Sequence, residues 1–106
     1  DAAHVLRVLS LNDFTDVEGV LDHLRDRSNV VILKVKPSLV SEKMELKRAL
    51  KRIQRTASAI GGDIAGIKED IIVITPPSMK IARAGGEQSV LAEPVSSPLP
   101  TEPVTE

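Results

Sequence analysis

The sequence has no cysteine, tryptophan or tyrosine, and Phe14 is its only aromatic residue. Without cysteine there are no disulfides, cysteine-ligated zinc sites, iron–sulfur clusters or cysteine nucleophiles. Without more aromatic residues the chain lacks the stacking surfaces on which single-strand and RNA binders depend. No apolar run approaches the roughly 20 residues of a membrane span, and no signal peptide is visible. What is left is a small chain whose core must be built from aliphatic side chains.

The 106 residues are enough for one domain, and their charges are divided unevenly. The net charge of −1 argues against a protein built mainly to coat nucleic acid or an anionic membrane. All 14 lysines and arginines lie in residues 1–84, whereas residues 85–106 hold four glutamates, no basic residue and four of the seven prolines. We therefore expect a globular domain over 1–84 and a disordered, acidic, proline-rich tail over 85–106, which is either a spacer or a short recognition segment.

Five short segments rich in aliphatic and β-branched residues have the pattern of strands. The first two are residues 4–9 and 30–35, and a proline ends the second. Residues 63–67 and 71–75 flank a short polar connection, which predicts an antiparallel hairpin. The last segment, 79–82, follows two prolines and is a candidate fifth strand at the edge of the sheet.

Two amphipathic helices separate these strands. Apolar residues recur at helical spacing over 13–25, and Asn12 and Asp13 are both suitable residues to start this helix. A second apolar seam runs through 41–60, with Ser41 as its candidate cap, and Gly61 ends the helix as a left-handed C-terminal cap does. The predicted fold is α/β: a two-layer sandwich of two helices on a mixed sheet, with the order β-α-β-α-β-β and an optional fifth strand.

The strands at 30–33 and 71–74 are apolar at every position, although a sheet with one solvated face alternates. Both faces of the sheet therefore require cover. If both helices lie on one face, a second copy of the chain is the economical cover for the other, which predicts a homodimer. The alternative is one helix on each face and a monomer.

The two predicted helices have opposite charge. Residues 13–27 carry five acids and two arginines, whereas 41–60 carries six cations and two glutamates. The cations either receive an acidic ligand or form an ordinary solvated face with oppositely charged neighbours along the helix. Five of them form two adjacent stripes on the solvent side and are the candidate binding residues: Lys47, Arg48, Lys51, Arg52 and Arg55.

The sequence has no motif that predicts catalysis or a cofactor. His4 opens a strand, and His23 lies among carboxylates on the acidic helix, where an exposed histidine is ordinary. The serines are in no nucleophile elbow, and the glycines follow a helix into a strand, the reverse of a phosphate-binding loop. We therefore expect a protein that is not an enzyme and that has no metal site and no cofactor.

Residues 59–82 resemble the end of the core domain of the SepF family of cell-division proteins. That domain closes with a helix, a Gly-Gly-Asp-Ile turn, a hairpin ending in Thr-Pro and a short apolar strand. The upstream elements also fit, so the resemblance extends over about residues 4–83. Where many bacterial members have aromatic residues at the end of the long helix, this chain has aliphatic ones and is more similar to archaeal members. The residues that match the closing pattern are Gly61, Gly62, Asp63, Ile64, Asp70, Ile74, Thr75 and Pro76.

The resemblance implies a cytoplasmic, non-enzymatic adaptor that forms a dimer and binds the C-terminal peptide of the tubulin-like protein FtsZ at the inner face of the cell membrane, at the division site. SepF-like proteins reach the membrane through an N-terminal amphipathic helix; this chain begins at Asp1 without one, so we expect that segment to precede it. The dimer is expected on the sheet face opposite the helices, where Gly62 would allow two backbones to approach. The candidate interface residues are Gly61, Gly62, Ile64, Ile72 and Ile74.

A second hypothesis belongs to a different class. The order β-α-β-α-β-β with a basic helix is also similar to Alba-type chromatin proteins, which bind nucleic acid as dimers. The nearly neutral total charge, the acidic first helix and the lack of a basic hairpin argue against this alternative. Nucleic acid is therefore not the expected partner.

Overall fold

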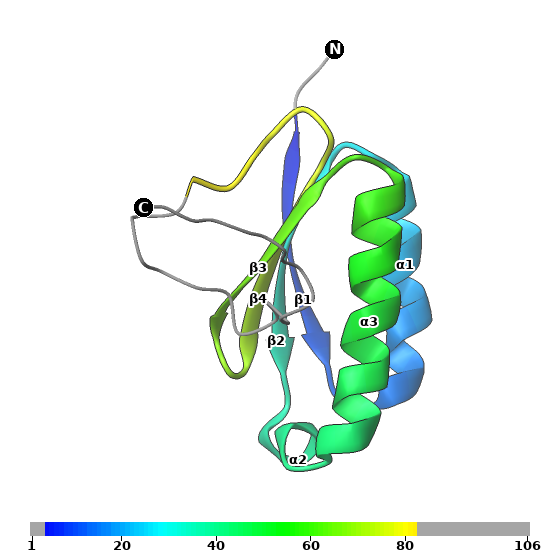
Figure 1. The fold of residues 1–106 in the computed structure, drawn as a ribbon, viewed down its shortest axis with the longest axis vertical. Coiled ribbons are helices and arrows are strands. Elements are labelled where there is room, and N and C mark those ends of the chain that lie inside the picture. The colour runs from blue at the N-terminus through cyan, green and yellow to red at the C-terminus, as the bar shows by residue number, and fades with distance from the viewer. Residues whose placement is uncertain (1–3, 83–106) are drawn as a thin grey trace, which may run out of the picture.

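The computed structural model describes residues 4–82, which form a four-stranded sheet with helices on one side (Figure 1). The elements are β1 (Val5–Leu11), η1 (Phe14–Asp16), α1 (Val17–Arg25), β2 (Asn29–Val35), α2 (Pro37–Val40), α3 (Lys43–Ala59), β3 (Asp63–Lys68) and β4 (Ile71–Thr75). The strands lie in the order β1-β2-β4-β3; β1 and β2 are parallel, and β4 is antiparallel to both of its neighbours. This confirms the predicted mixed sheet and element order, to which a 3-10 turn and one short helix are added.

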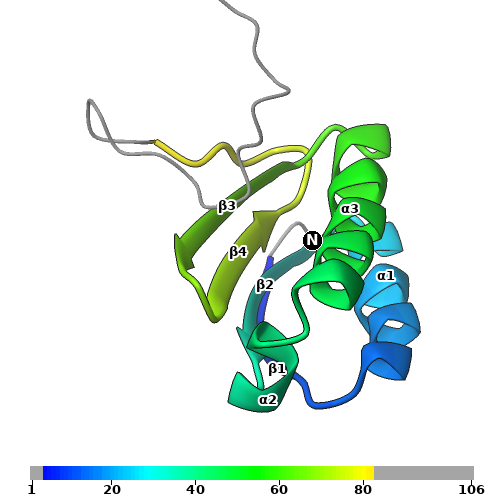
Figure 2. The same cartoon turned by 60° about the horizontal axis from the view of Figure 1, so that its bottom comes forward.

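Both long helices lie on the same face of the sheet, where they close the core (Figures 1 and 2). Along β2 the side chains alternate: Val31, Leu33 and Val35 are buried, whereas Lys34 is exposed. The buried positions join the apolar seams of α1 and α3 in one continuous cluster. The alternative of one helix on each face is therefore wrong, and the opposite face carries no helix among the described residues.

The buried polar residue Asn29 ties the start of β2 to the end of α1. Its side chain is 2% exposed, and its amide nitrogen donates to the carbonyl of His23 at 2.7 Å and to the carboxylate of Asp26 at 3.2 Å. Its amide oxygen accepts from Nε of Arg7 in β1 at 2.9 Å. A buried amide with partners at both ends fixes how the first helix meets the two parallel strands, and the sequence pattern did not indicate this contact.

Of the two predicted starting residues, Asn12 and Asp13, it is Asp13 that caps the first helical segment, and the first turn is a 3-10 turn. Its carboxylate accepts from both the backbone N–H and the hydroxyl of Thr15 at 3.0 Å. The side chain of Asp16 accepts in return from the backbone N–H of Asp13 at 3.1 Å, which completes a capping box. The hydrogen bond from the Thr15 backbone is the main reason why the pKa of Asp13 is lowered.

We expect this cap to stabilise the fold at neutral pH and to lose its effect in acid. Because the pKa of Asp13 is lowered in the folded state, its contribution is present above the unfolded-state pKa and is lost as pH falls through the folded-state pKa. Asn at this position can still cap the turn but does not titrate. The unfolding free energy of Asp13→Asn, measured in urea from neutral pH into acid, should therefore vary less with pH than that of the unchanged protein. An identical pH dependence would contradict this prediction.

The connection between β2 and α3 differs from the prediction. Pro37 follows β2 as expected but is also the first residue of the short helix α2, a position where proline is favoured. Ser41 does not cap α3, because its hydroxyl donates to the carbonyl of Ser38 at 2.9 Å and so closes α2. α3 begins at Lys43, two residues later than predicted, after Glu42, whose side chain makes no capping hydrogen bond.

α3 ends in the predicted glycine cap. Gly61 has a φ of 82°, and the N–H groups of Gly61 and Gly62 donate to the carbonyls of Ser58 and Ala57 at 3.0 and 2.8 Å, as in a Schellman motif. At Gly62 the helix end also meets β4, because a Cβ there would lie 2.1 Å from the carbonyl oxygen of Thr75. The close backbone approach that Gly62 permits is thus found within a single chain.

The segment after β4 does not form the fifth strand that was considered for residues 79–82. The N–H of Met79 turns back to the carbonyl of Pro76 at 3.0 Å, and the N–H of Ile81 donates to the carboxylate of Asp63 at 2.9 Å. A side chain therefore takes the hydrogen bond that a strand partner's carbonyl would accept, and the prolines and the turn direct the chain away from a ladder. The tail predicted over 85–106 lies outside the described residues.

Candidate protein-binding surfaces

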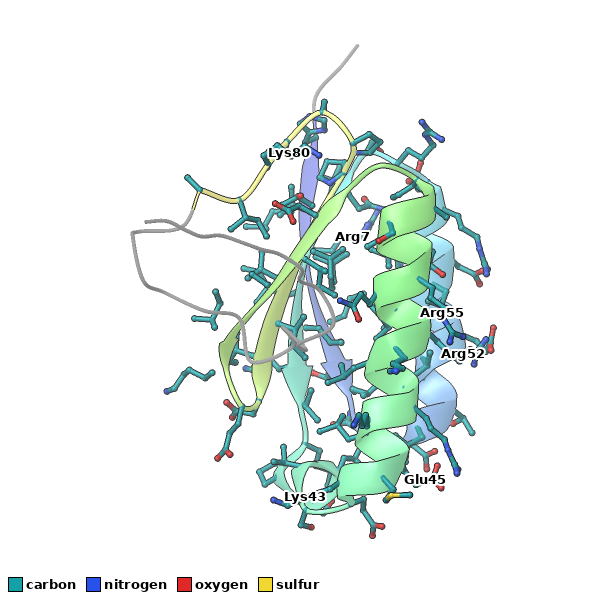
Figure 3. All side chains as sticks on the ribbon, viewed as in Figure 1. Arg7, Lys43, Glu45, Arg52, Arg55 and Lys80 are labelled. Atoms are coloured by element: carbon teal, nitrogen blue, oxygen red, sulfur yellow. The ribbon has the colours of Figure 1, made fainter. Side chains whose placement is uncertain are left out.

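Four cations form an exposed stripe along the solvent side of α3. They are spaced four residues apart and so form one oblique row on the helix surface, with Lys43 and Arg55 at its ends on different flanks (Figure 3). All four are exposed, and none has an ion pair with a described residue. Figure 3 labels the first and last members of the row. We refer to Lys43, Lys47, Lys51 and Arg55 as the open stripe.

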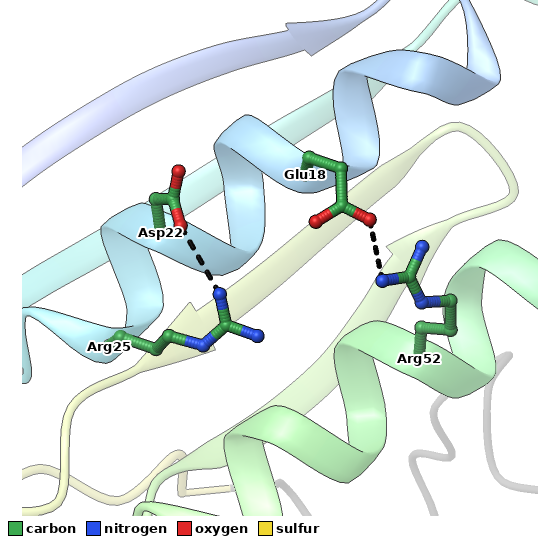
Figure 4. Close-up of polar contacts among 4 residues, drawn as sticks. All are labelled: Glu18, Asp22, Arg25 and Arg52. Atoms are coloured by element: carbon green, nitrogen blue, oxygen red, sulfur yellow. Dashed lines mark hydrogen bonds and ion pairs between the residues drawn. The ribbon is translucent and has the colours of Figure 1, made fainter.

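The two other cations of α3 are paired with acids. Arg52 donates to the carboxylate of Glu18 in α1 at 2.6 Å (Figure 4), and Arg48 donates to that of Glu45 at 3.3 Å. At least half of each of these side chains is exposed, so either pair contributes at most about 1 kcal/mol. Their larger effect is on the distribution of charge along α3. Glu45 and Glu18 neutralise Arg48 and Arg52, so the positive charge without an acidic partner among the described residues is that of the open stripe.

The five predicted binding cations therefore divide into two groups. Three lie in the open stripe, whereas Arg48 and Arg52 face acids. The sequence-based set omitted Lys43, which extends the stripe by one turn toward the start of the helix. Its spacing of four residues from Lys47 was the signal that could have indicated it.

Two apolar side chains border the open stripe. Met44 is 70% exposed in the first turn of α3, and Leu50 is half-buried at the side of the core. The apolar seam of the helix faces inward, and Ile53 at its centre is fully buried, so the seam itself is closed to a ligand. A peptide that lay along the stripe would meet cations over its length and apolar contacts at these two side chains.

The second exposed surface is the sheet face without helices. The strand register places Val8, Ile32 and Val73 side by side in one row across β1, β2 and β4. Ala65 of β3 continues this row but is only 3% exposed. Val8 is 60% exposed, as is Leu6, which points to the same side two residues earlier. We call Leu6, Val8, Ile32 and Val73 the sheet patch. Single exposed apolar residues are ordinary, but a contiguous apolar row is typical of a surface that binds another protein.

The residues predicted for a dimer interface lie beside the sheet patch rather than in it. Ile72 and Ile74 of β4 point toward the helices and are 1% and 0% exposed, and Ile64 packs against the same core. Gly61 and Gly62 belong to the cap of α3. A contact through the face opposite the helices would therefore use the alternate residues of these strands.

The described residues offer little else that points to a function. Residues 4–82 hold no group of three or more acidic or histidine side chains placed to bind a metal ion. His4 lies 2.9 Å from the hydroxyl of Ser78, an exposed contact between the start of β1 and the segment after β4. Within this part of the chain no helix has the length and the apolar character to cross a bilayer. The open stripe and the sheet patch are thus the two surfaces on which function must be argued.

The fold and these two surfaces define a small α/β domain whose exposed features suit contacts with other proteins. The family model described as Cell division protein SepF matches residues 6–81. The chain belongs to the SepF family.

Solved structures agree with this assignment. A SepF-like protein from Pyrococcus furiosus is 31% identical, with 77% of this chain and 98% of that chain covered and a TM-score of 0.67. A SepF-like protein from Archaeoglobus fulgidus is 28% identical, with 74% and 93% covered and a TM-score of 0.68. The search of curated proteins gives no match. The likeness to archaeal proteins is consistent with the archaeal character of the sequence, and none of these matches supports the chromatin-protein alternative.

Proposed function

We propose that the chain is a non-enzymatic adaptor of cell division, which forms a homodimer and binds the C-terminal peptide of FtsZ. Membership of the SepF family supports this role. The observation that carries it on this chain is the open stripe, four cations in one row without an acidic partner among the described residues. A position at the inner face of the membrane at the division site would follow from FtsZ binding, and the peptide titration below tests that step.

The open stripe suits the kind of peptide that the SepF resemblance implies. Such tails are short segments with apolar anchors and charged residues, and they need apolar contacts beside a complementary charge. The stripe supplies the charge, and Met44 and Leu50 supply apolar surface next to it. Because the inward seam of α3 is closed, more apolar surface would have to come from the same helix of a second protomer, which would make peptide binding depend on dimerisation.

The dimer itself is proposed to form through the sheet patch. A stable interface covers about 800 Å² on each partner and has an apolar centre. An accessible apolar row across β1, β2 and β4 provides such a centre, and a two-fold axis through it would place the same row against itself. Each protomer would then have helices on one face of its sheet and a second sheet on the other.

Charge reversal within the open stripe tests the peptide site. Replacing Lys51 and Arg55 together by glutamate removes two attractions and adds two repulsions, each worth about 0.5 kcal/mol at an exposed site. The sum of about 2 kcal/mol predicts that affinity for the FtsZ C-terminal peptide falls about thirtyfold at low salt. Isothermal titration calorimetry at low and high salt would measure this, and the difference between the two proteins should shrink as salt rises.

The matched control carries the same change in net charge at another place. Lys36 and Lys68 are exposed, have no ion pair with a described residue and lie outside α3. Lys36→Glu with Lys68→Glu should leave peptide affinity within about twofold, since only long-range attraction is altered. If the stripe variant stays folded and dimeric and binds with unchanged affinity at both salt concentrations, the site lies elsewhere, and the hairpin beside Pro76 would be examined next.

A further inference from the structure

β1 lies at one edge of the sheet and has a neighbouring strand, β2, on one side only among the described residues (Figure 2). The N–H of Val5 donates to the carbonyl of Ser28 at 3.1 Å, and the carbonyl of Leu11 accepts from the N–H of Lys36 at 2.9 Å, both on the side of β2. Backbone groups alternate in direction along a strand, so the residues between these two that have even numbers point theirs away from β2. We call the outward N–H and C=O groups the free edge, and they belong to Leu6, Val8 and Ser10.

The two edges of the sheet differ in how they are protected. β3, at the other edge, has a bulge between Gly66 and Lys68, and the N–H of Ile81 donates to the carboxylate of Asp63 at its start. Bulges and covering segments are devices that keep edge strands from pairing with other chains. β1 is regular over its seven residues and has no proline and no lysine, and no hydrogen bond from residues 4–82 reaches the free edge. An unprotected edge of this kind is a template for another strand.

A second copy of β1 fits the free edge when the two strands run antiparallel about a two-fold axis at Val8. Val8 then lies opposite Val8 of the second copy, and Leu6 lies opposite Ser10. These are hydrogen-bonded pairs, so every N–H and C=O group of the free edge finds a partner. Between them Arg7 lies opposite Leu9, which keeps the two arginines of the pair apart.

The neighbouring registers fit less well. A shift of two residues toward the start of the strand would place Arg7 directly opposite Arg7 of the second copy, and like charges in this position are destabilising. A shift of two residues the other way would place Leu6 opposite Asn12, which lies beyond the end of the strand. The sequence of β1 therefore favours the register centred on Val8.

We propose that β1 pairs with β1 of a second copy in this register and joins their two sheets edge to edge. The two-fold axis is perpendicular to the sheet, so the helices of both copies lie on one side and their sheet patches adjoin on the other. The contact is separate from the proposed dimer, which uses the face of the sheet, and it rests neither on that dimer nor on FtsZ binding. It buries less surface than a face-to-face contact, so we expect it at higher protein concentration than the dimer.

Hydrogen exchange of the full chain, measured by NMR, tests the pairing. The amides of the free edge should exchange rapidly at micromolar protein concentration and more slowly at millimolar concentration, whereas those of Arg7 and Leu9, which face β2, should be slow at both. With about nine tenths of the edges paired, exchange should be about tenfold slower, because an amide exchanges only from an unpaired edge. Rapid exchange at millimolar concentration would overturn the proposal. Equal protection at every concentration would assign the edge to a segment of the same chain and overturn it as well.

A mixture of isotope-enriched and unenriched chains determines the register. The Cα atoms of a non-hydrogen-bonded antiparallel pair are about 4.5 Å apart, which brings the two α-protons into contact. The proposal therefore expects a nuclear Overhauser effect between the α-protons of Arg7 in one chain and Leu9 in the other. Slowed exchange without this effect would overturn the pairing.

A proline within the free edge supplies the variant. Ser10 is exposed and lies outside both the sheet patch and the open stripe, and its outward N–H makes no bond to β2. Ser10→Pro removes this donor and blocks the approach of a strand, so the amides of Leu6 and Val8 should exchange rapidly even at millimolar concentration. Ser10→Ala keeps the backbone donor and should behave like the unchanged protein.

Circular dichroism shows whether Ser10→Pro is folded. If it is not, Leu6→Pro takes its place near the start of the strand, where proline is tolerated, and the amides of Val8 and Ser10 are followed instead. Slow exchange at millimolar concentration in a folded proline variant would overturn the proposal, and so would rapid exchange in Ser10→Ala.

Discussion

Replacing Gly62 with alanine should destabilise the fold by about 3 kcal/mol or more. A Cβ at this position would lie 2.1 Å from the carbonyl oxygen of Thr75 and 3.3 Å from its carbonyl carbon. Both atoms belong to the backbone of β4, whose hydrogen bonds to its neighbours hold it in place, so the clash cannot be relieved by rotating a side chain. Overpacking of this kind costs about 1–3 kcal/mol and more where the backbone must move, a large part of the 5–15 kcal/mol that stabilises a typical domain.

Gly19 provides the matched control. It lies in α1, and a Cβ there would meet no atom within 4 Å. Gly19→Ala should therefore stabilise the protein by about 0.5–1 kcal/mol through the higher helix propensity of alanine. Urea denaturation followed by circular dichroism measures both variants. A Gly62→Ala protein as stable as the unchanged one would show that α3 does not end against β4 as described.

This result also bears on how the dimer is tested. The sequence led to Gly62 as a place where two chains could approach, but its close contact is within the chain. A bulky residue there would unfold the protomer, and a loss of dimer would then say nothing about the interface. The test has to use a residue that is exposed in the protomer.

Local signals in the sequence predicted the ends of the elements well. Asp13 and Gly61 cap their helices because each cap depends only on neighbouring residues and on backbone conformation. The prediction that Ser41 caps the long helix was wrong. Ser41 instead closes a short helix that begins at Pro37, and a helix of four residues is too short to give a periodic pattern in the sequence.

The choice of face could be predicted for one strand and not for another. In β2, Lys34 is the polar residue, so it marks the face without helices. Ile32, two residues earlier, points to the same face. In β4, residues 71–74 are all apolar. Alternate residues of a strand face opposite sides of the sheet, but a run with no polar residue does not show which set faces the core. Only its pairing with β2 and β3 decides that Ile72 and Ile74 enter the core and that Val73 faces outward.

Contacts between segments that are distant in the chain could not be predicted from the sequence. Arg52 and Glu18 are 34 residues apart and meet because α1 and α3 pack side by side (Figure 4). The sequence contains both charges and gives the two helices opposite net charge, but the rotation of α3 about its axis decides which cations meet an acid. That rotation is fixed by the buried seam, and it leaves the open stripe facing solvent.

Introducing a charge at Val8 should dissociate the dimer. Val8 is 60% exposed in the protomer, so Val8→Glu should change the free energy of unfolding of one chain by about 0.5 kcal/mol or less. In a dimer formed through the sheet patch, the carboxylate would be buried in an apolar contact, at a cost of about 3–5 kcal/mol for an unpaired charge. Even 3 kcal/mol raises the dissociation constant about a hundredfold, and two-fold symmetry introduces the charge twice.

Met44→Glu is the control for this prediction. Met44 is 70% exposed and apolar, but it lies on α3, on the opposite side of the sheet from the patch. Sedimentation equilibrium should show a dimer for the unchanged protein and for Met44→Glu, and a monomer with native circular dichroism for Val8→Glu. If the unchanged protein is a monomer, the proposal of a dimer is wrong. If instead Met44→Glu dissociates and Val8→Glu does not, the chains associate through their helices, and the open stripe would lie in that contact rather than at a peptide site.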